Sequence, residues 1–548
     1  MAELTGAQAL VSALVSQGTR YLFGIPGVHT LPLYDALADS PQLVPIVTRH
    51  EAGATHAADG YARVSGQPGV VSVVPGPGAL NASTGVLCAW SDRVPMIVLT
   101  AQLDPSDRHA AVHECDLEAA YRPFTKAQLH ISTYEDIALV VGEAFARALH
   151  AQAGPVQVLI PLHVLHERGS VQQVAAPHTV DARIDNARIA ELTSFLRKLR
   201  APTLVLGMGV TGLGPQVITL VERLGAPAFT DVAVRGLIPE DHPLAAGLLS
   251  WSSATDVLAA SDGMLVLGSR LSEITTLNWD VRLPHKLARV DADESELQGN
   301  YSATVAVQAD PALVLRQLLD ILPATLTSVP SPAAHALMAA RNQQEPVLPE
   351  SRPGCIHPRA AVRALRAALP RDAIVTSDGT ATEFWLSEPS FPILSPAGFI
   401  VPEIQQTMGY GLAAAVGAAV AQSDVGSPRP IVCVTGDGSL QMLLGELATA
   451  ASLDRQFTVV IFDDGYYNAL RIYQDGLYGR QVGVALRNPD FVLLGRAYGA
   501  DVMRVEDVGD LKGAVEQALA ASKLSIVSVA IDPAPLPDRY ARRLQQMI

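Results

Sequence analysis

Short apolar runs alternate with helix-length segments over the first third of the chain. The apolar runs have the length of strands and lie at 21–23, 43–47, 69–74, 96–100 and 156–160. Helical patterns, such as the one over 51–64, separate them. Strands that alternate with helices in this way predict an α/β domain with a mostly parallel sheet.

The same alternation returns twice farther along the chain. Strand-like runs lie at 203–206, 228–229, 264–267 and 288–290, and again at 374–376, 431–434, 459–462 and 526–530. Polar or Pro-rich segments at 166–184 and 325–358 read as linkers, the second with a helix near 333–341. The pattern predicts an α/β fold of three Rossmann-like, doubly wound parallel-sheet domains at 1–165, 185–322 and 359–535, and an amphipathic closing helix at 538–548.

The third region contains a unit of strand, Gly-rich turn, helix and strand. An apolar run leads into Gly-Asp-Gly-Ser at 436–439, and a helix over about 440–453 and a second strand at 457–462 follow. A right-handed crossover brings the C-terminal ends of two such parallel strands to one edge of the sheet. Asp437 and Asp464 follow those ends. Two acids beside a Gly turn at a helix start suit a divalent cation with a phosphate.

The composition limits which partners the protein can bind and indicates in which cellular compartment it functions. Charged residues make up 17% of the chain, and the net charge of −15 comes without a basic cluster, which argues against nucleic acid and anionic membranes. The four cysteines are widely spaced and form no CxxC pair, as expected of reduced thiols in a cytoplasmic protein. The N-terminus does not read as a signal peptide, and no uncharged apolar stretch is long enough to span a bilayer.

Glu51 is the first candidate for acid–base chemistry. It follows the strand at 43–47 and opens the helix at 51–64. An acid at a helix start is favourable with the helix dipole, so Glu51 is open to a purely structural interpretation. The small residues at 52–54 let another surface approach closely, which favours a buried acid that handles a proton.

Two Gly/Pro turns, 24–27 and 75–78, follow strands on the same predicted edge. They fit ordinary turns, or a ligand that approaches the backbone closely. His29 and His113 belong to the same domain, where a lone His is more often structural or exposed than catalytic.

The second domain carries a GxGxxG pattern at 207–212, directly after the strand at 203–206. Such a pattern can mark a dinucleotide site, with Asp231 about 20 residues beyond it. The alternative is a tight turn in a Rossmann-like domain that binds no nucleotide.

Together these residues resemble the thiamine-diphosphate-dependent enzymes of the acetolactate synthase, pyruvate oxidase and 2-oxo acid decarboxylase type. The resemblance runs from 4 to 533. It is carried by GDGS at 436–439 with a second acid at 464, by FGIPG at 23–27, by TRHEAGATHAADGYAR at 48–63, by GPG followed by Asn81, and by RNPDFVLLGRAYGA at 487–500. The resemblance implies a pyrimidine-binding domain, a central domain and a diphosphate-binding domain.

The resemblance also implies roles for single residues. Asp437, the side chain of Asp464 and the backbone carbonyl of Tyr466 would hold Mg²⁺. Glu51 would hydrogen-bond the aminopyrimidine ring and promote the imino form, which removes the thiazolium C2 proton. Met408 would bend the cofactor so that its two rings meet. The implied cofactor-binding residues are Glu51, Pro26, Gly27, Gln406, Met408, Gly436, Asp437, Gly438, Ser439, Asp464 and Tyr466.

In that family the residues that correspond to Glu51 and Asp437 meet across a dimer interface, which implies a homodimer or a dimer of dimers. The FAD-binding residues of the central domain are not recognisable in this sequence, so FAD stays open.

Several positions depart from acetolactate synthases. The metal-binding Asn of the family is Asp464 here, Val28-His29 replaces small residues, His113 stands where Gln is usual, and Tyr473 replaces the substrate-selecting Trp. Some decarboxylases and aldehyde lyases have histidines that face the thiazolium, and His29 and His113 resemble these. The resemblance implies that His29 and His113 are catalytic.

The resulting interpretation is decarboxylation of a 2-oxo acid with thiamine diphosphate and Mg²⁺. The enamine is then either protonated to an aldehyde or joined to an aldehyde or a second 2-oxo acid, and the sequence leaves both outcomes open. Two readings of another class are a nicotinamide-dependent dehydrogenase that uses 207–212 and a non-catalytic binding subunit. The first leaves the GDG unit unexplained, and retention of Glu51 and Asp437 argues against the second.

Overall fold

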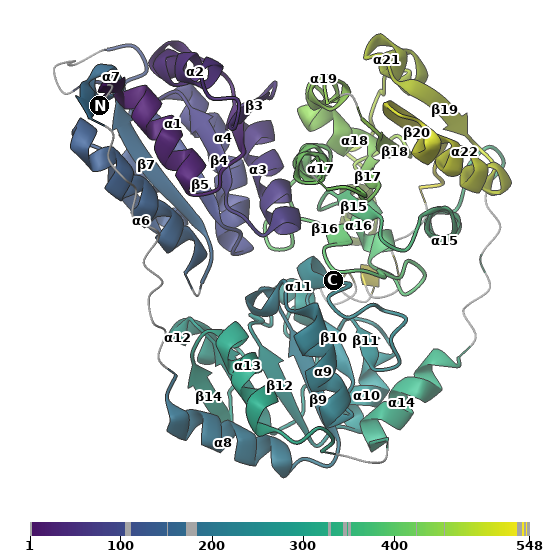
Figure 1. Cartoon of the computed structure of the whole chain (residues 1–548). Coiled ribbons are helices and arrows are strands. Elements are labelled where there is room, and N and C mark those ends of the chain that lie inside the picture. The colour runs from purple at the N-terminus through teal and green to yellow at the C-terminus, as the bar shows by residue number, and fades with distance from the viewer. Residues whose placement is uncertain are drawn as a thin grey trace. The chain divides into compact units, whose positions relative to one another are not determined.

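The computed structural model describes residues 3–104, 111–150, 152–170, 184–326, 330–343, 348, 352–423, 425–453, 455–533, 537, 540–541 and 544. It contains three six-stranded parallel sheets with helices between successive strands, which confirms the predicted α/β class (Figure 1). By their internal contacts the residues form two compact units. Unit 1 is Met1–Val180 with Gly409–Pro428 and Met442–Arg455, and unit 2 is Asp181–Met408 with Arg429–Gln441 and Gln456–Ile548. Among the described helices, none has both the length and the apolar character needed to cross a membrane.

Unit 1 is built on a sheet of strand order β3-β2-β4-β5-β7-β6. Its register places Leu22 opposite Val70 and Val70 opposite Ile97, so apolar side chains form rows across the sheet. Both faces of a parallel sheet are covered, which is why its inner strands read as continuous apolar runs. The strands are β2 Tyr21–Gly24, β3 Val44–Val47, β4 Gly69–Val73, β5 Met96–Gln102, β6 Ala127–His130 and β7 Pro155–Pro161, with a separate antiparallel pair, β1 Glu3–Thr5 and β8 Arg168–Ser170.

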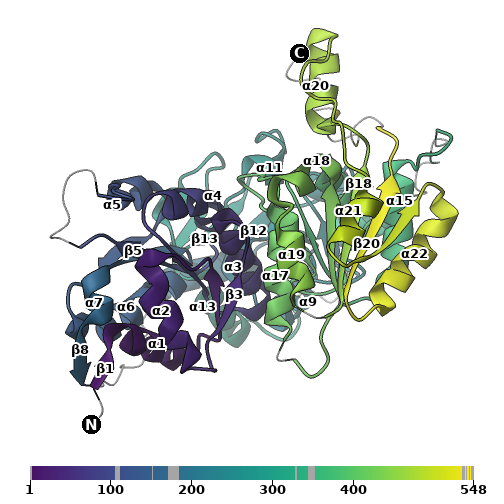
Figure 2. The same ribbon diagram turned by 90° about the horizontal axis from the view of Figure 1, so that it is seen from above.

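Helices cover both faces of this sheet (Figure 2). One face carries α1, α2 and α6, whose Leu10, Leu33 and Val141 belong to a single core cluster with Val70 and Ile97. On the other face α3 packs against α4 and β4. The helices are α1 Gly6–Ser16, η1 Val28–Thr30, α2 Leu31–Ala38, α3 Glu51–Ser65, α4 Pro77–Ser91, α5 Leu117–Tyr121, η2 Arg122–Phe124, η3 Tyr134–Asp136, α6 Ile137–Leu149 and α7 Leu162–His166.

Unit 1 also contains two helices from late in the chain, α17 Tyr410–Ala421 and α19 Glu446–Ala451. Figure 2 shows α17 beside α3, and their backbones touch. A Cβ on Gly60 would lie 2.1 Å from the carbonyl oxygen of Ala414, and one on Gly417 would lie 1.7 Å from that of Ala57. The small residues of both helices therefore allow a backbone-to-backbone contact that larger side chains would prevent.

The central sheet, in unit 2, has the strand order β11-β10-β9-β12-β13-β14. Its strands are β9 Pro202–Leu206, β10 Ala228–Thr230, β11 Ala245–Gly247, β12 Gly263–Leu267, β13 Leu287–Asp291 and β14 Val305–Gln308. Its helices are α8 Asn186–Arg197, η4 Met208–Val210, α9 Gly214–Leu224, η5 Val232–Val234, α10 Ala254–Ala259, α11 Glu273–Thr276, α12 Glu294–Leu297 and α13 Pro311–Ile321.

The GxGxxG segment of the central sheet serves packing. A Cβ on Gly207 would lie 2.3 Å from the carbonyl oxygen of Gly268, and one on Gly209 would lie 2.8 Å from the Cα of Gly268. The following helix begins only at Gly214, beyond the pattern, whereas a dinucleotide fingerprint opens its helix within it. Asp231 accepts hydrogen bonds from the Ser269 and Thr275 hydroxyls. This arrangement gives no support to the dehydrogenase interpretation.

The C-terminal sheet, also in unit 2, has the order β16-β15-β17-β18-β20-β19. Its strands are β15 Ile374–Ser377, β16 Phe399–Ile400, β17 Ile431–Gly436, β18 Phe457–Asp463, β19 Asp501–Val505 and β20 Leu524–Ala530. Its helices are α15 Pro358–Ala368, α16 Ala381–Leu386, α18 Asp437–Leu440, η6 Gln441–Leu443, α20 Asn468–Tyr478, α21 Phe491–Ala497 and α22 Val508–Ala520.

The single helix predicted over about 440–453 is wrong. The helix starts earlier, at Asp437, and the segment is divided into α18, η6 and α19. Gly445 interrupts it, where a Cβ would lie 3.0 Å from the Cβ of Arg49. The Gly-rich turn is therefore itself the first turn of a helix, and the Gly438 N–H in it donates to Asp437 Oδ1 at 2.8 Å.

A buried guanidinium joins the central and C-terminal sheets within unit 2. Arg235 pairs with Glu240 at 2.7 Å and donates to the carbonyl oxygens of Leu386 and Phe391. Leu386 ends α16, so the contact holds the C-terminal end of that short helix.

Outside the sheets, the predicted helix near 333–341 is confirmed as α14, Pro332–Arg341. Most of the predicted closing helix at 538–548 lies outside the described residues. Tyr540, which is described, stacks on Phe384 with ring centroids 3.9 Å apart. Most of the linker predicted at 166–184 also lies outside the described residues.

Candidate active site

In unit 2, the acids of the Gly-rich segment lie at the C-terminal edge of the C-terminal sheet. Strand β17 ends at Gly436, which pairs with Phe462 near the end of β18. Asp437 is the residue that follows β17, and only 2% of its surface is exposed. Its Oδ1 accepts the Gly438 N–H at 2.8 Å, and its Oδ2 accepts the Gly465 N–H at 2.8 Å. Burial raises the pKa of Asp437 above its ordinary value, although these hydrogen bonds favour the ionised form.

Asp464 is the second acid of this edge. Its Oδ1 accepts the Tyr466 N–H at 2.9 Å. Burial, together with the nearby charge of Asp437, raises the pKa of Asp464 to about 7. Two carboxyl groups that repel each other in a buried place are poised to share a cation.

Asn488 belongs to the same cluster, although no sequence motif predicts a role for it. Its Nδ2 donates to Asp437 Oδ2 at 2.5 Å and to Asp463 Oδ1 at 2.9 Å. The Gln441 side chain donates to Asn488 Oδ1 at 3.1 Å. Asn488 lies in the RNPDF segment that carries part of the family resemblance, and this is the sequence feature that points to it.

Hydroxyl groups flank the end of β17. A Cβ on Gly436 would lie 3.4 Å from Thr382 Oγ1 and 4.0 Å from Thr380 Oγ1. The Thr380 hydroxyl oxygen is buried and has no hydrogen-bond partner within the part of the chain that the structure describes. A Cβ on Gly438 would lie 2.6 Å from the Tyr467 ring, so only glycine fits there. Hard oxygen ligands, a spare hydroxyl and a glycine backbone fit a metal-bound diphosphate.

The predicted residues Gln406 and Met408 come from the segment before α17. Gln406 adopts φ +47° and lies against Gly379, where a Cβ would meet its Cα at 2.3 Å. Gly379 follows β15, so Gln406 stands at the same strand edge as Asp437. Met408 is half-buried.

In unit 1, Glu51 is the first residue of α3 and is half-buried. Its Oε2 accepts the Asn81 amide at 3.1 Å, and a Cβ on Gly78 would lie 3.4 Å from its Oε1. Gly78 and Gly27 both pack on Val74, with Cβ positions 2.6 and 2.5 Å from it. The two Gly/Pro turns, which include Pro26, therefore meet beside Glu51.

His29 and His113 lie together at this edge. Their ring centroids are 5.2 Å apart. His113 adopts φ +69°, a strained conformation for a residue with a Cβ, and packs on Gly76 of the second Gly/Pro turn. Buried Nδ1 leaves Nε2 of His113 as the ring atom that can face a ligand. Val28 and Val112 beside them are 71% and 73% exposed, which marks an open apolar edge.

Each unit thus gathers its own set of predicted residues. Unit 1 brings together Pro26, Gly27, His29, Glu51 and His113. Unit 2 brings together Gln406, Gly436, Asp437, Gly438, Ser439, Asp464 and Tyr466. Met408 is the last residue of the segment 181–408, which also belongs to unit 2.

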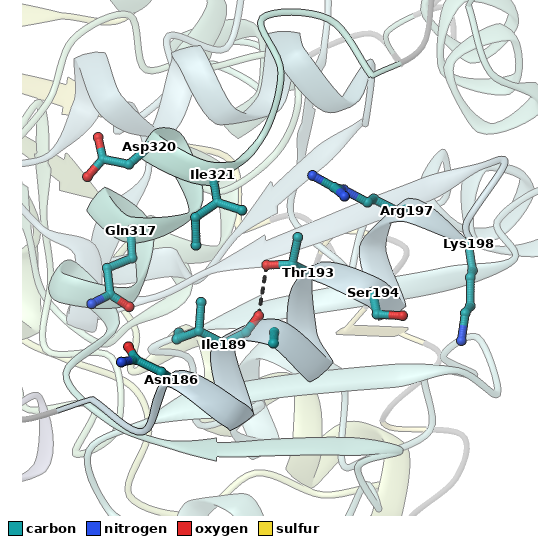
Figure 3. A pocket seen from close by; sticks show the side chains of 10 residues that line it. Asn186, Ile189, Thr193, Ser194, Arg197, Lys198, Gln317, Asp320 and Ile321 are labelled. Carbon is teal, nitrogen blue, oxygen red and sulfur yellow. Dashed lines mark hydrogen bonds between the residues drawn. The ribbon is translucent and has the colours of Figure 1, made fainter.

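A groove of about 740 Å³ lies elsewhere, between α8 and α13 of the central part (Figure 3). Arg197, Lys198 and Asp320 stand on its rim. It contains none of the predicted site residues, so its size is no guide to the chemistry.

Comparison with protein families gives three matches in chain order. The N-terminal TPP binding domain of thiamine pyrophosphate enzymes matches residues 4–120, the central domain matches 189–318, and the C-terminal TPP binding domain matches 378–529. The chain therefore belongs to the thiamine pyrophosphate enzyme family, and it binds thiamine diphosphate.

Curated relatives match over nearly the whole chain. A probable 2-ketoarginine decarboxylase of Pseudomonas aeruginosa is 34% identical, over 96% of this chain and 94% of its own length. A probable acetolactate synthase large subunit of Methanocaldococcus jannaschii is 30% identical, over 97% and 92%. Acetolactate synthase isozyme 3 large subunit of Escherichia coli is 30% identical, over 97% and 96%. The predicted class, a thiamine-diphosphate-dependent decarboxylase or carboligase of 2-oxo acids, is thereby confirmed.

Proposed function

We propose that this enzyme decarboxylates a 2-oxo acid and releases the product as an aldehyde. The observation that carries the proposal is the pair His29 and His113 beside Glu51 at one sheet edge, with ring centroids 5.2 Å apart. A panel of 2-oxo acids, scored for CO₂ and aldehyde, tests it. Release of CO₂ without aldehyde from every acid of the panel would reject it.

Residues of unit 2 would bind the metal ion and the diphosphate. Asp437, Asp464 and the backbone carbonyl of Tyr466 would hold Mg²⁺, and Gly438 and Ser439 would donate N–H groups to the diphosphate. The donor set supports this assignment because it offers one buried and one half-buried carboxylate and no nitrogen or sulfur ligand, as a hard cation requires. Among the residues that the structure describes, no group of three or more His, Cys, Asp or Glu side chains could hold a metal ion, so the proposed ligands are two carboxylates and one backbone carbonyl.

The proton chemistry falls to unit 1. Bound thiamine diphosphate supplies a nucleophilic carbon and accepts the electron pair as CO₂ leaves. Glu51 would exchange a proton with the pyrimidine ring, while the amide of Asn81 holds its Oε2. His113 would deliver a proton from Nε2 after CO₂ has left, and the His29 ring packs beside it, with ring centroids 5.2 Å apart.

A second candidate is carboligation to acetolactate, favoured by the acetolactate synthase relatives, which match along almost the entire chain. Pyruvate as the only substrate separates the two reactions, since one gives acetaldehyde and the other acetolactate. No turnover of pyruvate would point to a larger 2-oxo acid. The name of the Pseudomonas relative makes 2-ketoarginine the first such acid to test.

Asp464 gives a prediction for the pH dependence of metal binding. Because the pKa of Asp464 is raised to about 7, its carboxyl group is protonated below that pH and must lose the proton to bind a cation. The Mg²⁺ affinity should therefore fall about tenfold between pH 8 and pH 6. Isothermal titration at both pH values measures it. Asp464→Asn should abolish this step, and an unchanged step in that variant would assign it to another group.

His113 gives a prediction for the product. His113→Gln should slow aldehyde release about 100-fold while leaving CO₂ formation in the first turnover nearly unchanged, because a proton donor acts only after CO₂ has left. Rapid-quench measurement of both products tests it. His130→Gln, at an exposed histidine of β6, is the control. Equal loss of both products would place His113 before decarboxylation.

A homodimer or a dimer of dimers with shared sites extends the proposal. Exposed apolar residues support it at both parts of the site. Val28, Leu31 and Val112 are 71%, 52% and 73% exposed beside the histidine pair. In α20, which stands out from its sheet in Figure 2, Leu470 and Tyr478 are 55% and 69% exposed. FAD stays open, and the colour of the purified protein decides it, since a bound flavin is yellow.

A further inference from the structure

Glu446 is a buried carboxylate whose contacts the chemistry described above does not use. It is the first residue of α19 and is 1% exposed. It lies nine residues after Asp437 in the chain. Burial raises the pKa of Glu446 above its ordinary value. A buried carboxylate costs free energy unless hydrogen bonds offset it, so its partners indicate its role.

The contacts of Glu446 lead to the residues directly before Glu51. Its Oε1 accepts the backbone N–H of Arg49 and that of His50, each at 3.0 Å. Its Oε2 accepts the Thr449 hydroxyl at 2.6 Å. Both oxygens are thus engaged, and a single carboxylate oxygen binds two consecutive amides.

The start of α3 is shaped to receive this carboxylate. A Cβ on Gly53 would lie 2.2 Å from Glu446 Oε1, so only glycine leaves room for it. His50 caps the helix itself, since its Nδ1 accepts the Ala52 N–H at 3.1 Å. The backbone on the N-terminal side of Glu51 is therefore held by Glu446, and the backbone on its C-terminal side by the helix.

We propose that Glu446 is a positioning residue, which fixes the backbone at Arg49 and His50 so that Glu51 presents its carboxyl group to the pyrimidine ring. The inference rests on the role proposed for Glu51. The proposal connects the Gly-Asp-Gly-Ser segment with Glu51 through the chain. The segment that carries Asp437 continues into α19, and Glu446, the first residue of α19, binds the backbone just before Glu51. A shift of about 1 Å in a reacting group can cost about 100-fold in rate, which makes such a support matter.

Two variants separate position from charge. Glu446→Asp keeps the negative charge but shortens the side chain by one methylene, so the carboxylate no longer reaches both amides. Glu446→Gln keeps the length and an oxygen that can accept both N–H groups, while its amide can face the Thr449 hydroxyl. A positioning role predicts damage in the first variant and little damage in the second.

The readout is the rate of hydrogen–deuterium exchange at the thiazolium C2 of bound thiamine diphosphate, measured in the Mg²⁺-loaded enzyme without substrate. Exchange should slow about 10- to 100-fold in Glu446→Asp and less than about threefold in Glu446→Gln. The dissociation constant of the cofactor, measured by fluorescence quenching, should change less than about threefold in both.

Asp262→Ala is the matched control. Asp262 also accepts two consecutive backbone amides, those of Arg200 and Ala201, but in the central sheet region. It should leave C2 exchange unchanged. If Asp262→Ala slows exchange as much as Glu446→Asp does, general destabilisation explains the result and the proposal is overturned.

Two further outcomes overturn the proposal. Normal exchange in Glu446→Asp would show that the hydrogen bonds to the Arg49 and His50 amides are not needed. Slow exchange in Glu446→Gln would show that the charge or proton of Glu446 matters, and not the length of its side chain. Glu51→Gln, measured in parallel, separates this failure from failure of the proposed function. If Glu51→Gln exchanges normally, the role of Glu51 is wrong, whatever Glu446 does.

Discussion

Glu51→Gln is expected to lower kcat by about 10²- to 10⁴-fold, the range that a positioned acid–base group contributes. The amide has the length of the native side chain and keeps an oxygen that can accept the Asn81 amide hydrogen. However, an amide does not ionise near neutral pH, so it cannot release a proton to the pyrimidine ring and take it back. Because Glu51 is only half-buried at a helix start, the substitution leaves the core intact. Turnover of the best 2-oxo acid and exchange at the thiazolium C2 should fall together.

The expected pattern distinguishes chemistry from binding. The KM and the cofactor affinity should change far less than kcat, because the lost group acts on the bound ring. Glu143→Gln, at an exposed acid of α6 that pairs with Arg147, is the control for a neutral amide on the same domain. Unchanged turnover in Glu51→Gln would remove this residue from the mechanism.

The accuracy of the predicted strands depended on their place in the sheet. The inner strands of all three sheets read as apolar runs because both of their faces are buried, as in β4. Within the three six-stranded sheets, the missed strands are β6, β11, β14, β16 and β19, and all five are sheet edges, although the edge strand β3 was predicted. In β14 buried and exposed residues alternate, and β16 has two residues, so neither leaves an apolar run to detect.

The candidate site shows a similar division. Asp437 and Asp464 could be placed from local sequence because each directly follows a strand. Asn488 reaches Asp437 across 51 residues of chain, and Glu446 reaches Arg49 across 397. Neither contact has a local pattern. Thr380 and Thr382 were not predicted as site residues, because threonine at the start of a helix is typical of an ordinary cap.

Asp437→Asn should abolish activity by preventing cofactor loading. Asp437 offers the metal a buried carboxylate, and its oxygens also hold Gly465 and Asn488. The Asn amide carries no charge. Its NH₂ group would also face either the Gly438 N–H or the Gly465 and Asn488 N–H groups, which need an acceptor. The affinity for Mg²⁺-thiamine diphosphate should fall by more than the about 10- to 100-fold typical of supporting residues. Equilibrium dialysis of the cofactor measures it.

The unfolding temperature of Asp437→Asn provides a separate check. Without cofactor, the variant should unfold close to the native temperature, because removing a costly buried charge offsets the loss of a hydrogen bond to Gly465 or Asn488. Added Mg²⁺ and thiamine diphosphate should stabilise the native protein and not the variant. Equal stabilisation of both would show that the cofactor binds without Asp437.

Mixing the two inactive variants tests whether the sites are shared between chains. If the enzyme is the proposed homodimer, half of the dimers should contain one of each when Glu51→Gln and Asp437→Asn subunits are dissociated and reassociated at random. If each site takes Glu51 from one chain and Asp437 from the other, every mixed dimer has one intact site and one that carries both substitutions. The mixture should then recover about a quarter of the native activity. A mixture that stays inactive, although mass spectrometry shows mixed dimers, would mean that each chain supplies both residues to its own site.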